Sequence, residues 1–193
     1  MAVTDIPEKE KNTRAKKMML WFGMVSLVMA FAGWTSAYIF SGSREDWVKE
    51  LQLPSSFYIS AAVIITSSLT YILAKRAIKK GNGALCSLFL VTTLLLGIAF
   101  IQLQFNGFSQ MLSNGYYFTG PSSSIKMSYI FLIAAVHVVH VVAGVISLLV
   151  VLYNQLKGRY SSTDYLGLSL GATFWHFLDV LWVYLILFMT FVK

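Results

Sequence analysis

Five apolar stretches, each long enough to cross a lipid bilayer, limit what this chain can fold into. They cover residues 18–40, 54–74, 84–105, 127–153 and 165–192. A helix needs about 20 apolar residues to span about 30 Å of hydrocarbon, and each stretch meets that requirement. Lipid offers the backbone no hydrogen-bond partners, and the sequence lacks the strict alternation of a membrane β-barrel. The predicted fold class is therefore all-α, a bundle of five transmembrane helices.

The composition supports a membrane protein and argues against a soluble domain. Of the 193 residues, 57% are hydrophobic and 12% are charged, and the mean hydropathy is +0.69. A soluble domain has about 25% charged residues. The net charge of +7 does not indicate nucleic-acid binding, because the basic residues gather at the ends of the apolar stretches. The single cysteine, Cys86, excludes an intrachain disulfide.

The basic residues of the loops predict the orientation in the membrane. Of the 15 lysine and arginine residues, 11 lie before the first stretch, between the second and third, or between the fourth and fifth. The positive-inside rule therefore predicts a cytoplasmic N-terminus and an external C-terminus. Residues 1–17 mix acidic and basic side chains without apolar periodicity. They are predicted to form a cytoplasmic N-terminal tail, followed by a single transmembrane domain over residues 18–193.

Two pairs of ionisable side chains interrupt the last two apolar stretches. His137 and His140 lie three residues apart in AAVHVVHVVAG, and His176 and Asp179 have the same spacing in FWHFLDVLW. This spacing puts both members of a pair on one helical face. The short loop between the stretches predicts antiparallel neighbours, and a rise of about 1.5 Å per residue puts the four side chains within a layer about 8 Å thick. They are predicted to form a polar cluster near the middle of the membrane.

Three interpretations of this cluster remain open. In the first, the Asp179 carboxylate accepts hydrogen bonds from imidazole or indole groups and holds helices together, since an unpaired charge in lipid costs at least about 2.5 kcal/mol. In the second, the histidines ligate haem iron or another metal, although three histidines are too few for two haems. In the third, His and Asp carry protons, although no other acidic residue occurs in an apolar stretch. The first, structural interpretation is favoured.

Bulky and small residues on the same two stretches are predicted to pack helices against each other. They are Trp175, Trp182, Gly144, Gly167 and Gly171. Gly167 and Gly171 form a GxxxG motif, which permits close approach of membrane helices but also recurs by chance in apolar sequence. No soluble-enzyme motif such as GxSxG, a P-loop or HExxH occurs in the sequence.

Four motifs, in order along the chain, resemble subunit III of the haem-copper terminal oxidases, the family that includes cytochrome c oxidase subunit III. The motifs are LPSSFYISAAVIITSSLT, GIAFIQLQ, HVVHVVAG and FWHFLDVLW. The matching residues are Pro54, Ser67, Ser68, Gly97, Phe100, Gln104, His137, His140, Val141, Gly144, Trp175, His176, Phe177, Asp179 and Trp182. The resemblance covers nearly the whole five-helix region.

The sequence departs from the usual pattern of that family at a few positions. Leu27 stands where many members have a glutamate, so a role for that carboxylate does not carry over. Gly107 and Phe108 stand where a Glu-Tyr pair often follows the glutamine. Seven-helix members begin with two further helices that shape a lipid-filled cleft. The chain resembles the short, five-helix form, which lacks them.

The resemblance implies a subunit that has no redox centre, catalytic residue or metal ligand of its own. Haem and copper are expected in partner subunits, and bound phospholipid is compatible with the resemblance. The expected partners are catalytic subunit I and subunit II, within a respiratory complex or larger supercomplex of a bacterial plasma membrane. The reaction of the complex would be oxygen reduction to water coupled to proton translocation.

Two alternatives to a cytochrome c oxidase subunit stay open. One is subunit III of a quinol oxidase, because nothing in the sequence identifies the electron donor. The other, from a different class, is a small proton-coupled membrane carrier. A carrier usually has inverted repeats or broken helices, and the sequence shows neither.

Overall fold

Five long helices make up most of the described chain. The computed structural model describes residues 8–44, 47, 53–118, 120 and 124–192. The helices are α1 (Glu8–Ser41), α2 (Ser55–Lys79), α3 (Gly83–Ser113), α4 (Ile125–Leu156) and α5 (Leu166–Phe191). All five are long and apolar enough to cross a membrane, and no strand occurs within the described ranges. The predicted all-α fold with five spans is therefore confirmed.

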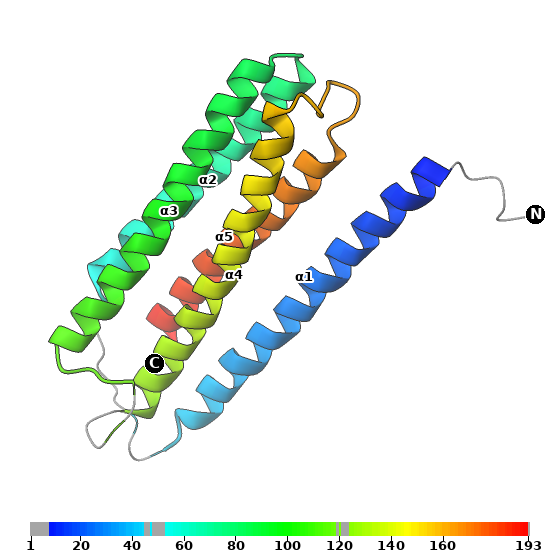
Figure 1. Cartoon of the computed structure of the whole chain (residues 1–193). Helices are drawn as coiled ribbons and strands as arrows, with labels where there is room; N and C mark the ends of the chain where they lie inside the picture. Colours follow the sequence, from blue (N-terminus) through cyan, green and yellow to red (C-terminus); the bar gives the residue numbers. More distant parts are fainter. Residues whose placement is uncertain (1–7, 45–46, 48–52, 119, 121–123, 193) are drawn as a thin grey trace, which may run out of the picture.

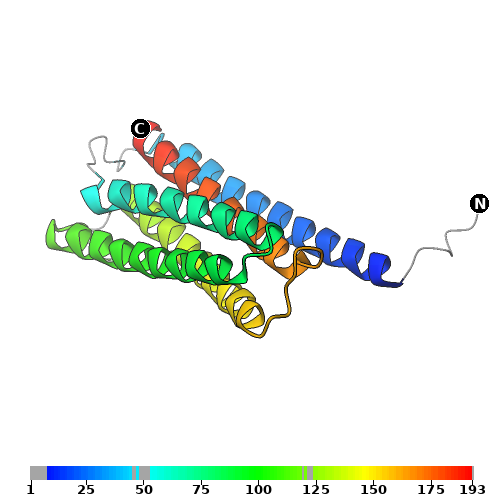
Figure 2. The same cartoon turned by 90° about the horizontal axis from the view of Figure 1, so that it is seen from above.

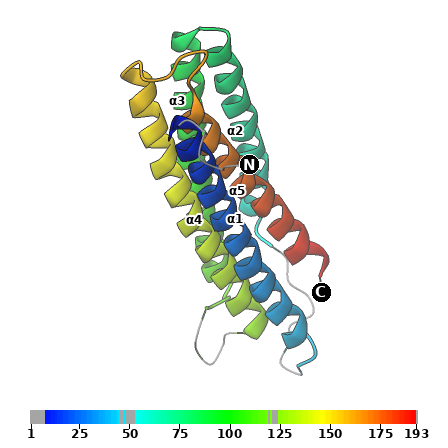
Figure 3. The same ribbon diagram turned by 90° about the vertical axis from the view of Figure 1, so that its right-hand side faces the viewer.

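The helices α2 to α5 pack together, and α1 lies along one side of them (Figure 1). α2 packs against α3 and α5, and α4 packs against α3 and α5. Within the described part of the chain, α1 contacts only α4 and α5. Seen from above, α1 and α3 lie on opposite sides of the bundle (Figure 2). The N-terminal end of α1 shares one end of the bundle with the α2–α3 and α4–α5 connections (Figure 3).

The start of α1 differs from the predicted start of the first span. α1 begins at Glu8, so residues 8–17 of the predicted N-terminal tail are helical; residues 1–7 lie outside the described residues. Arg14 and Glu10 form an ion pair of 2.6 Å one helical turn apart. Apolar residues mark where the membrane begins, whereas a helix continues beyond it when polar side chains pair along its surface. α3 likewise runs past its predicted end at residue 105, to Ser113.

The connections at one end of the bundle contain residues that suit tight reversals. Gly81 follows α2 and Gly158 follows α4, with φ angles of 76° and 66°. Glycine adopts this left-handed conformation without a steric penalty from a Cβ atom. The Asn82 side chain accepts a 3.1 Å hydrogen bond from the Leu85 backbone N–H and starts α3. These connections return the chain antiparallel to the helix before it.

Burial differs strongly between the first and the last helix. Half of the most apolar window of α5 is buried inside the bundle, compared with 17% for α1. A membrane helix with little internal burial has most of its surface available to lipid or to another protein chain. Polar side chains of α5 are therefore held inside the bundle, where other helices supply their partners.

Candidate intramembrane polar site

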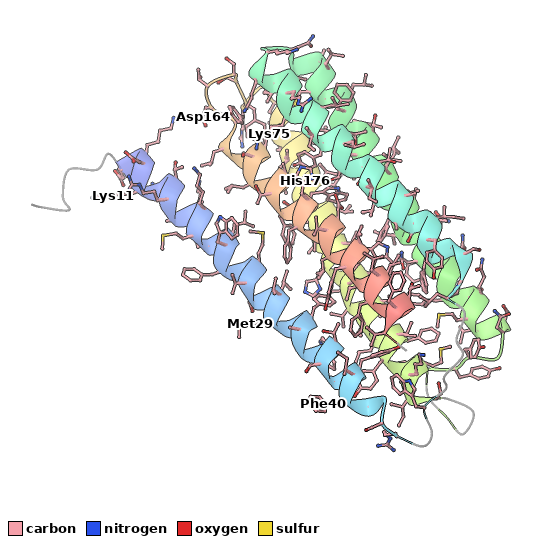
Figure 4. All side chains as sticks on the ribbon, turned by 180° about the vertical axis from the view of Figure 1, so that it is seen from behind. Lys11, Met29, Phe40, Lys75, Asp164 and His176 are labelled. Atoms are coloured by element: carbon pink, nitrogen blue, oxygen red, sulfur yellow. The ribbon has the colours of Figure 1, made fainter. Side chains whose placement is uncertain are left out.

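His176 and Asp179 lie on the face of α5 that packs against α2. The imidazole Nδ1 of His176 is 2.5 Å from the hydroxyl oxygen of Ser68 on α2, a short hydrogen bond. The same nitrogen is 4.0 Å from an Asp179 carboxylate oxygen, within the range of an ion pair but longer than a hydrogen bond. Figure 4 shows His176 between α5 and its neighbours, inward from Lys75. α2 and α5 thus hold a serine, an imidazole and a carboxyl group together.

The Asp179 carboxyl group is enclosed by the bundle. Its residue is only 3% exposed. Among the described residues, neither carboxyl oxygen meets a hydrogen-bond donor. A charged group is strongly disfavoured in such surroundings unless a donor or a cation compensates it. The nearest ionisable partner is His176 on the same helix.

His137 and His140 on α4 have different surroundings from His176. The His137 ring is fully buried and stacks on Trp182, with 4.9 Å between ring centres. Phe31 of α1 contacts both α4 histidine rings edge-on. His140 donates from Nδ1 to the Val136 carbonyl oxygen at 2.7 Å. His137 and His140 therefore lie in aromatic surroundings on α4, whereas His176 and Asp179 form the α2–α5 site.

Metal binding was one interpretation of the four ionisable side chains. Throughout the described ranges, no three His, Cys, Asp or Glu side chains are grouped closely enough to hold a metal ion. Within those ranges, neither His137 ring nitrogen has a hydrogen-bond partner. A metal-ligating histidine normally donates its second ring N–H to an oxygen that fixes its orientation. The geometry of the described residues thus favours hydrogen bonding and aromatic packing for these groups.

Two tryptophans of α5 donate hydrogen bonds to two serines of α2. The indole N–H of Trp175 bonds to Ser67 at 3.0 Å, and that of Trp182 bonds to Ser60 at 3.1 Å. The Gln104 amide of α3 donates to the same Ser60 hydroxyl at 2.7 Å. We call these five residues the tryptophan–serine ladder. It joins three helices through buried hydrogen bonds, which satisfy polar groups that lipid would leave unpaired.

Sequence reasoning identified only part of this ladder. The sequence predicts that Trp175 and Trp182 lie on the packing face, and Ser67 and Gln104 match the family, but it gives none of them a partner. Ser60 was missed altogether. The sequence does contain one signal. Trp175 and Trp182 are seven residues apart, as are Ser60 and Ser67, and this spacing keeps both members of a pair on the same side of a helix.

The glycines named from the sequence lie at close contacts between helices. An added Cβ at Gly144 would be 2.8 Å from Leu178, and one at Gly171 would be 2.7 Å from the Tyr71 hydroxyl. At Gly167 it would meet the Tyr160 ring. Gly97 of α3 faces the Trp175 indole, where the corresponding distance is 2.7 Å. A Cβ atom at Gly97 would therefore clash with a rigid ring, whereas at the other three positions the end of a leucine or tyrosine side chain would have to shift.

A cleft separates the N-terminal half of α1 from α4 and α5. Its outer part, of about 680 Å³, is lined mainly by polar residues, among them Lys16, Arg159 and Asp164. A deeper part of about 520 Å³ is mostly apolar. Lys9 of α1 donates a 2.9 Å hydrogen bond to Asp164 across the mouth and holds the pKa of that carboxyl below its usual value. This exposed ion pair connects α1 to the α4–α5 loop.

The fold and the buried polar contacts define a multi-pass α-helical membrane protein. The family model described as cytochrome c oxidase subunit III matches residues 45–192, which include α2 to α5 and the whole tryptophan–serine ladder. The chain belongs to the cytochrome c oxidase subunit III family.

Relatives from two kinds of oxidase are similar to this chain. The cytochrome c oxidase subunit 3 of Alkalihalophilus pseudofirmus is 27% identical over 93% of this chain and 88% of its own length. The cytochrome bo(3) ubiquinol oxidase subunit 3 of Buchnera aphidicola is 26% identical over 91% of this chain and 93% of its own. That of Pseudomonas aeruginosa is 34% identical over 65% of this chain, and the match spans 58% of the relative's length.

Proposed function

We propose that the chain is the third subunit of a proton-translocating haem-copper terminal oxidase. In this role it packs against catalytic subunit I, with subunit II nearby, and supports oxygen reduction to water without holding a redox centre. The single observation that carries the proposal is the family match over α2 to α5. The buried polar groups of those helices are hydrogen-bonding and packing groups, which suits a supporting role.

The electron donor of the complex is left open by this proposal. Relatives of similar coverage are named as cytochrome c oxidase and as ubiquinol oxidase subunits. The chain has the same role with either electron donor. We assign this multi-pass membrane protein to a bacterial plasma membrane. A larger respiratory supercomplex would be compatible with either donor.

Purification in mild detergent tests the proposal. The tagged full-length chain is expected to copurify with a large haem-containing protein, and the haem spectrum should follow the tagged chain through size exclusion. A proton-coupled carrier would instead elute without haem. Recovery of the intact chain from respiring membranes without any haem protein would contradict the oxidase assignment.

We propose an orientation with the N-terminus in the cytoplasm, which the distribution of basic residues supports. Lys80 and Ser43 are exposed residues in or next to loops at opposite ends of the bundle. In Lys80→Cys and Ser43→Cys variants, a membrane-impermeant thiol reagent added outside intact cells should label only position 43. Cys86 is buried and gives little background. Labelling of position 80 from outside would contradict the orientation.

The three histidines are expected to ligate neither haem nor copper. Replacing His137, His140 or His176 singly by glutamine should leave the haem spectrum and metal content unchanged per catalytic subunit. Retention of this subunit in the complex should fall instead, because lost ring contacts or hydrogen bonds loosen the packing. If one replacement removed a haem or copper signal while the large subunit stayed folded, a role as a metal ligand would follow.

We also propose that a phospholipid binds in the cleft between α1 and the α4–α5 pair. Basic residues at the mouth, such as Lys16 and Arg159, match an anionic headgroup. The deeper lining, which includes Val150, Leu170 and Phe174, matches acyl chains. Lipid extraction from the purified complex, followed by mass spectrometry of wild type and Arg159→Gln, measures the expected loss of bound lipid.

A further inference from the structure

We propose that Asp179 and His176 form a proton-binding site that exchanges with water from only one end of the bundle. The inference rests on this chain's own residues and does not depend on its place in an oxidase. The two groups lie 4.0 Å apart inside the membrane region, beside the Ser68 hydroxyl.

Charge balance indicates how many protons the pair holds. With one exchangeable proton, the pair is neutral overall, either as carboxylic acid and imidazole or as carboxylate and imidazolium. Adding or removing a proton gives the pair a net charge, which is strongly disfavoured inside a membrane. Neither carboxyl oxygen has a hydrogen-bond partner among the described residues, and the Ser68 hydroxyl beside the pair bonds to His176. The pair therefore holds one proton that either group can carry.

Of the three helices that pack against α5, α2 and α4 carry further ionisable groups near the site. On α2, the Tyr71 ring is 5.9 Å from the His176 ring, and Lys75 lies towards the end of the helix. On α4 the ionisable groups are His137 and His140, in the aromatic surroundings described above. α1 contributes Trp21 and Met24, which are not ionisable, to the groove beside His176. Tyr71 is thus the ionisable ring in contact with His176.

The contacts between α2 and α5 give the site a direction. The Tyr71 hydroxyl lies over Gly171, one to two turns before His176 on α5. It is buried and has no hydrogen-bond partner within the described residues. Towards the C-terminal end of α5, the next contact between α2 and α5 is made by Trp182 and Ser60, which do not titrate in the physiological range. The ionisable groups that flank the pair on α2, Tyr71 and Lys75, therefore lie on one side of it.

Proton exchange can follow these groups by ordinary transfer steps. A water molecule at the Lys75 end gives a proton towards the Tyr71 hydroxyl, which passes its own proton inward. When the pair has released its proton, the incoming proton forms a new N–H or O–H bond on His176 or Asp179, and hydroxide remains in the water. The reverse sequence releases the proton at the same end. Because Tyr71 and Lys75 lie on the same side of the pair, the site exchanges its proton at that end and does not conduct it across the membrane.

Infrared spectroscopy of the full-length chain in phosphatidylcholine nanodiscs tests the site. Aspartate carrying carbon-13 in the side-chain carboxyl labels Asp179 alone when Asp5, Asp46 and Asp164 are replaced by asparagine. A pH titration should convert the labelled carboxyl between its acid and carboxylate bands. His176→Gln should move the midpoint by at least about one pH unit, as expected for two strongly interacting groups. An unchanged midpoint, or no conversion at all, would overturn the proposal.

The rate of hydrogen–deuterium exchange at the labelled carboxyl tests the direction. Tyr71→Phe keeps the ring and removes the hydroxyl, so exchange should slow about tenfold or more. Tyr58→Phe is the matched control, because its hydroxyl bonds to Thr190 near the other end of α2. It should leave the exchange rate unchanged. Slower exchange in Tyr58→Phe, or unchanged exchange in Tyr71→Phe, would refute entry from the Lys75 end. Circular dichroism confirms that each variant is folded.

Discussion

Replacing Gly97 by leucine is expected to lower the free energy of unfolding more than any other single change considered for this chain. Even a Cβ atom at this position would lie 2.7 Å from the Trp175 ring. The indole is a rigid group, and its N–H is tied to Ser67, so it cannot turn away without breaking that hydrogen bond. Overpacking in a tight core costs about 1–3 kcal/mol and sometimes more. Gly97→Leu should exceed that range, and Gly97→Ala should fall within it.

Denaturant unfolding of the purified chain in mild detergent measures this effect. Gly33→Leu and Gly33→Ala are the matched controls, since Gly33 lies in the exposed part of α1 with nothing near its would-be Cβ. They should change the unfolding free energy little, or raise it through better helix propensity. Equal effects at positions 97 and 33 would mean that the Trp175 contact is not tight.

Ser60→Ala is expected to be the second most damaging change. The Ser60 hydroxyl accepts hydrogen bonds from both Gln104 and Trp182, so its removal leaves two buried donors without a partner. An unsatisfied buried donor costs about 1–3 kcal/mol, although single hydrogen bonds in membrane proteins average nearer 0.6 kcal/mol. We expect a loss of about 1–3 kcal/mol for the two together.

Two further serine and threonine changes separate hydrogen bonding from helix propensity. Ser67→Ala removes the acceptor of one indole and should cost less than Ser60→Ala. Thr66→Ala is the control on the same helix, because its exposed hydroxyl bonds to the Ala62 carbonyl of its own turn. In a double-mutant cycle, Trp182→Phe should reduce the cost of Ser60→Ala. If Ser60→Ala matched Thr66→Ala, the ladder would have no stabilising role.

The number and type of the helices could be predicted from the sequence because lipid imposes them. An apolar run of bilayer length has one common way to satisfy its backbone, and all five runs became helices. The start of α1 could not be predicted in the same way. The apolar stretch begins at residue 18, and the residues before it are polar. The ion pair between Glu10 and Arg14 stabilises a helix in that polar segment.

The candidate site was predictable within a helix but not between helices. A spacing of three residues places His176 and Asp179 on one face of α5, whatever surrounds it. Which α2 residue meets that face depends on how far each helix is rotated, and packing against third helices sets this rotation. The glycines at positions 97 and 144 let Trp175 enter between α3 and α4. That contact in turn aligns Ser67 and Ser68 with α5. The helical periodicity of a single stretch does not contain this information about its neighbours.

The position of α1 has a consequence for the order in which the protein is made. α1 leaves the ribosome before α2 and α3, yet its helix contacts within the described residues are with α4 and α5, which are synthesised after them. α2 meets α3 immediately, whereas α1 must remain in the bilayer without its native neighbours while two intervening helices are inserted. Contacts that are distant in sequence form late. α1 thus enters the membrane before α2 and α3 but reaches its native neighbours after they have paired.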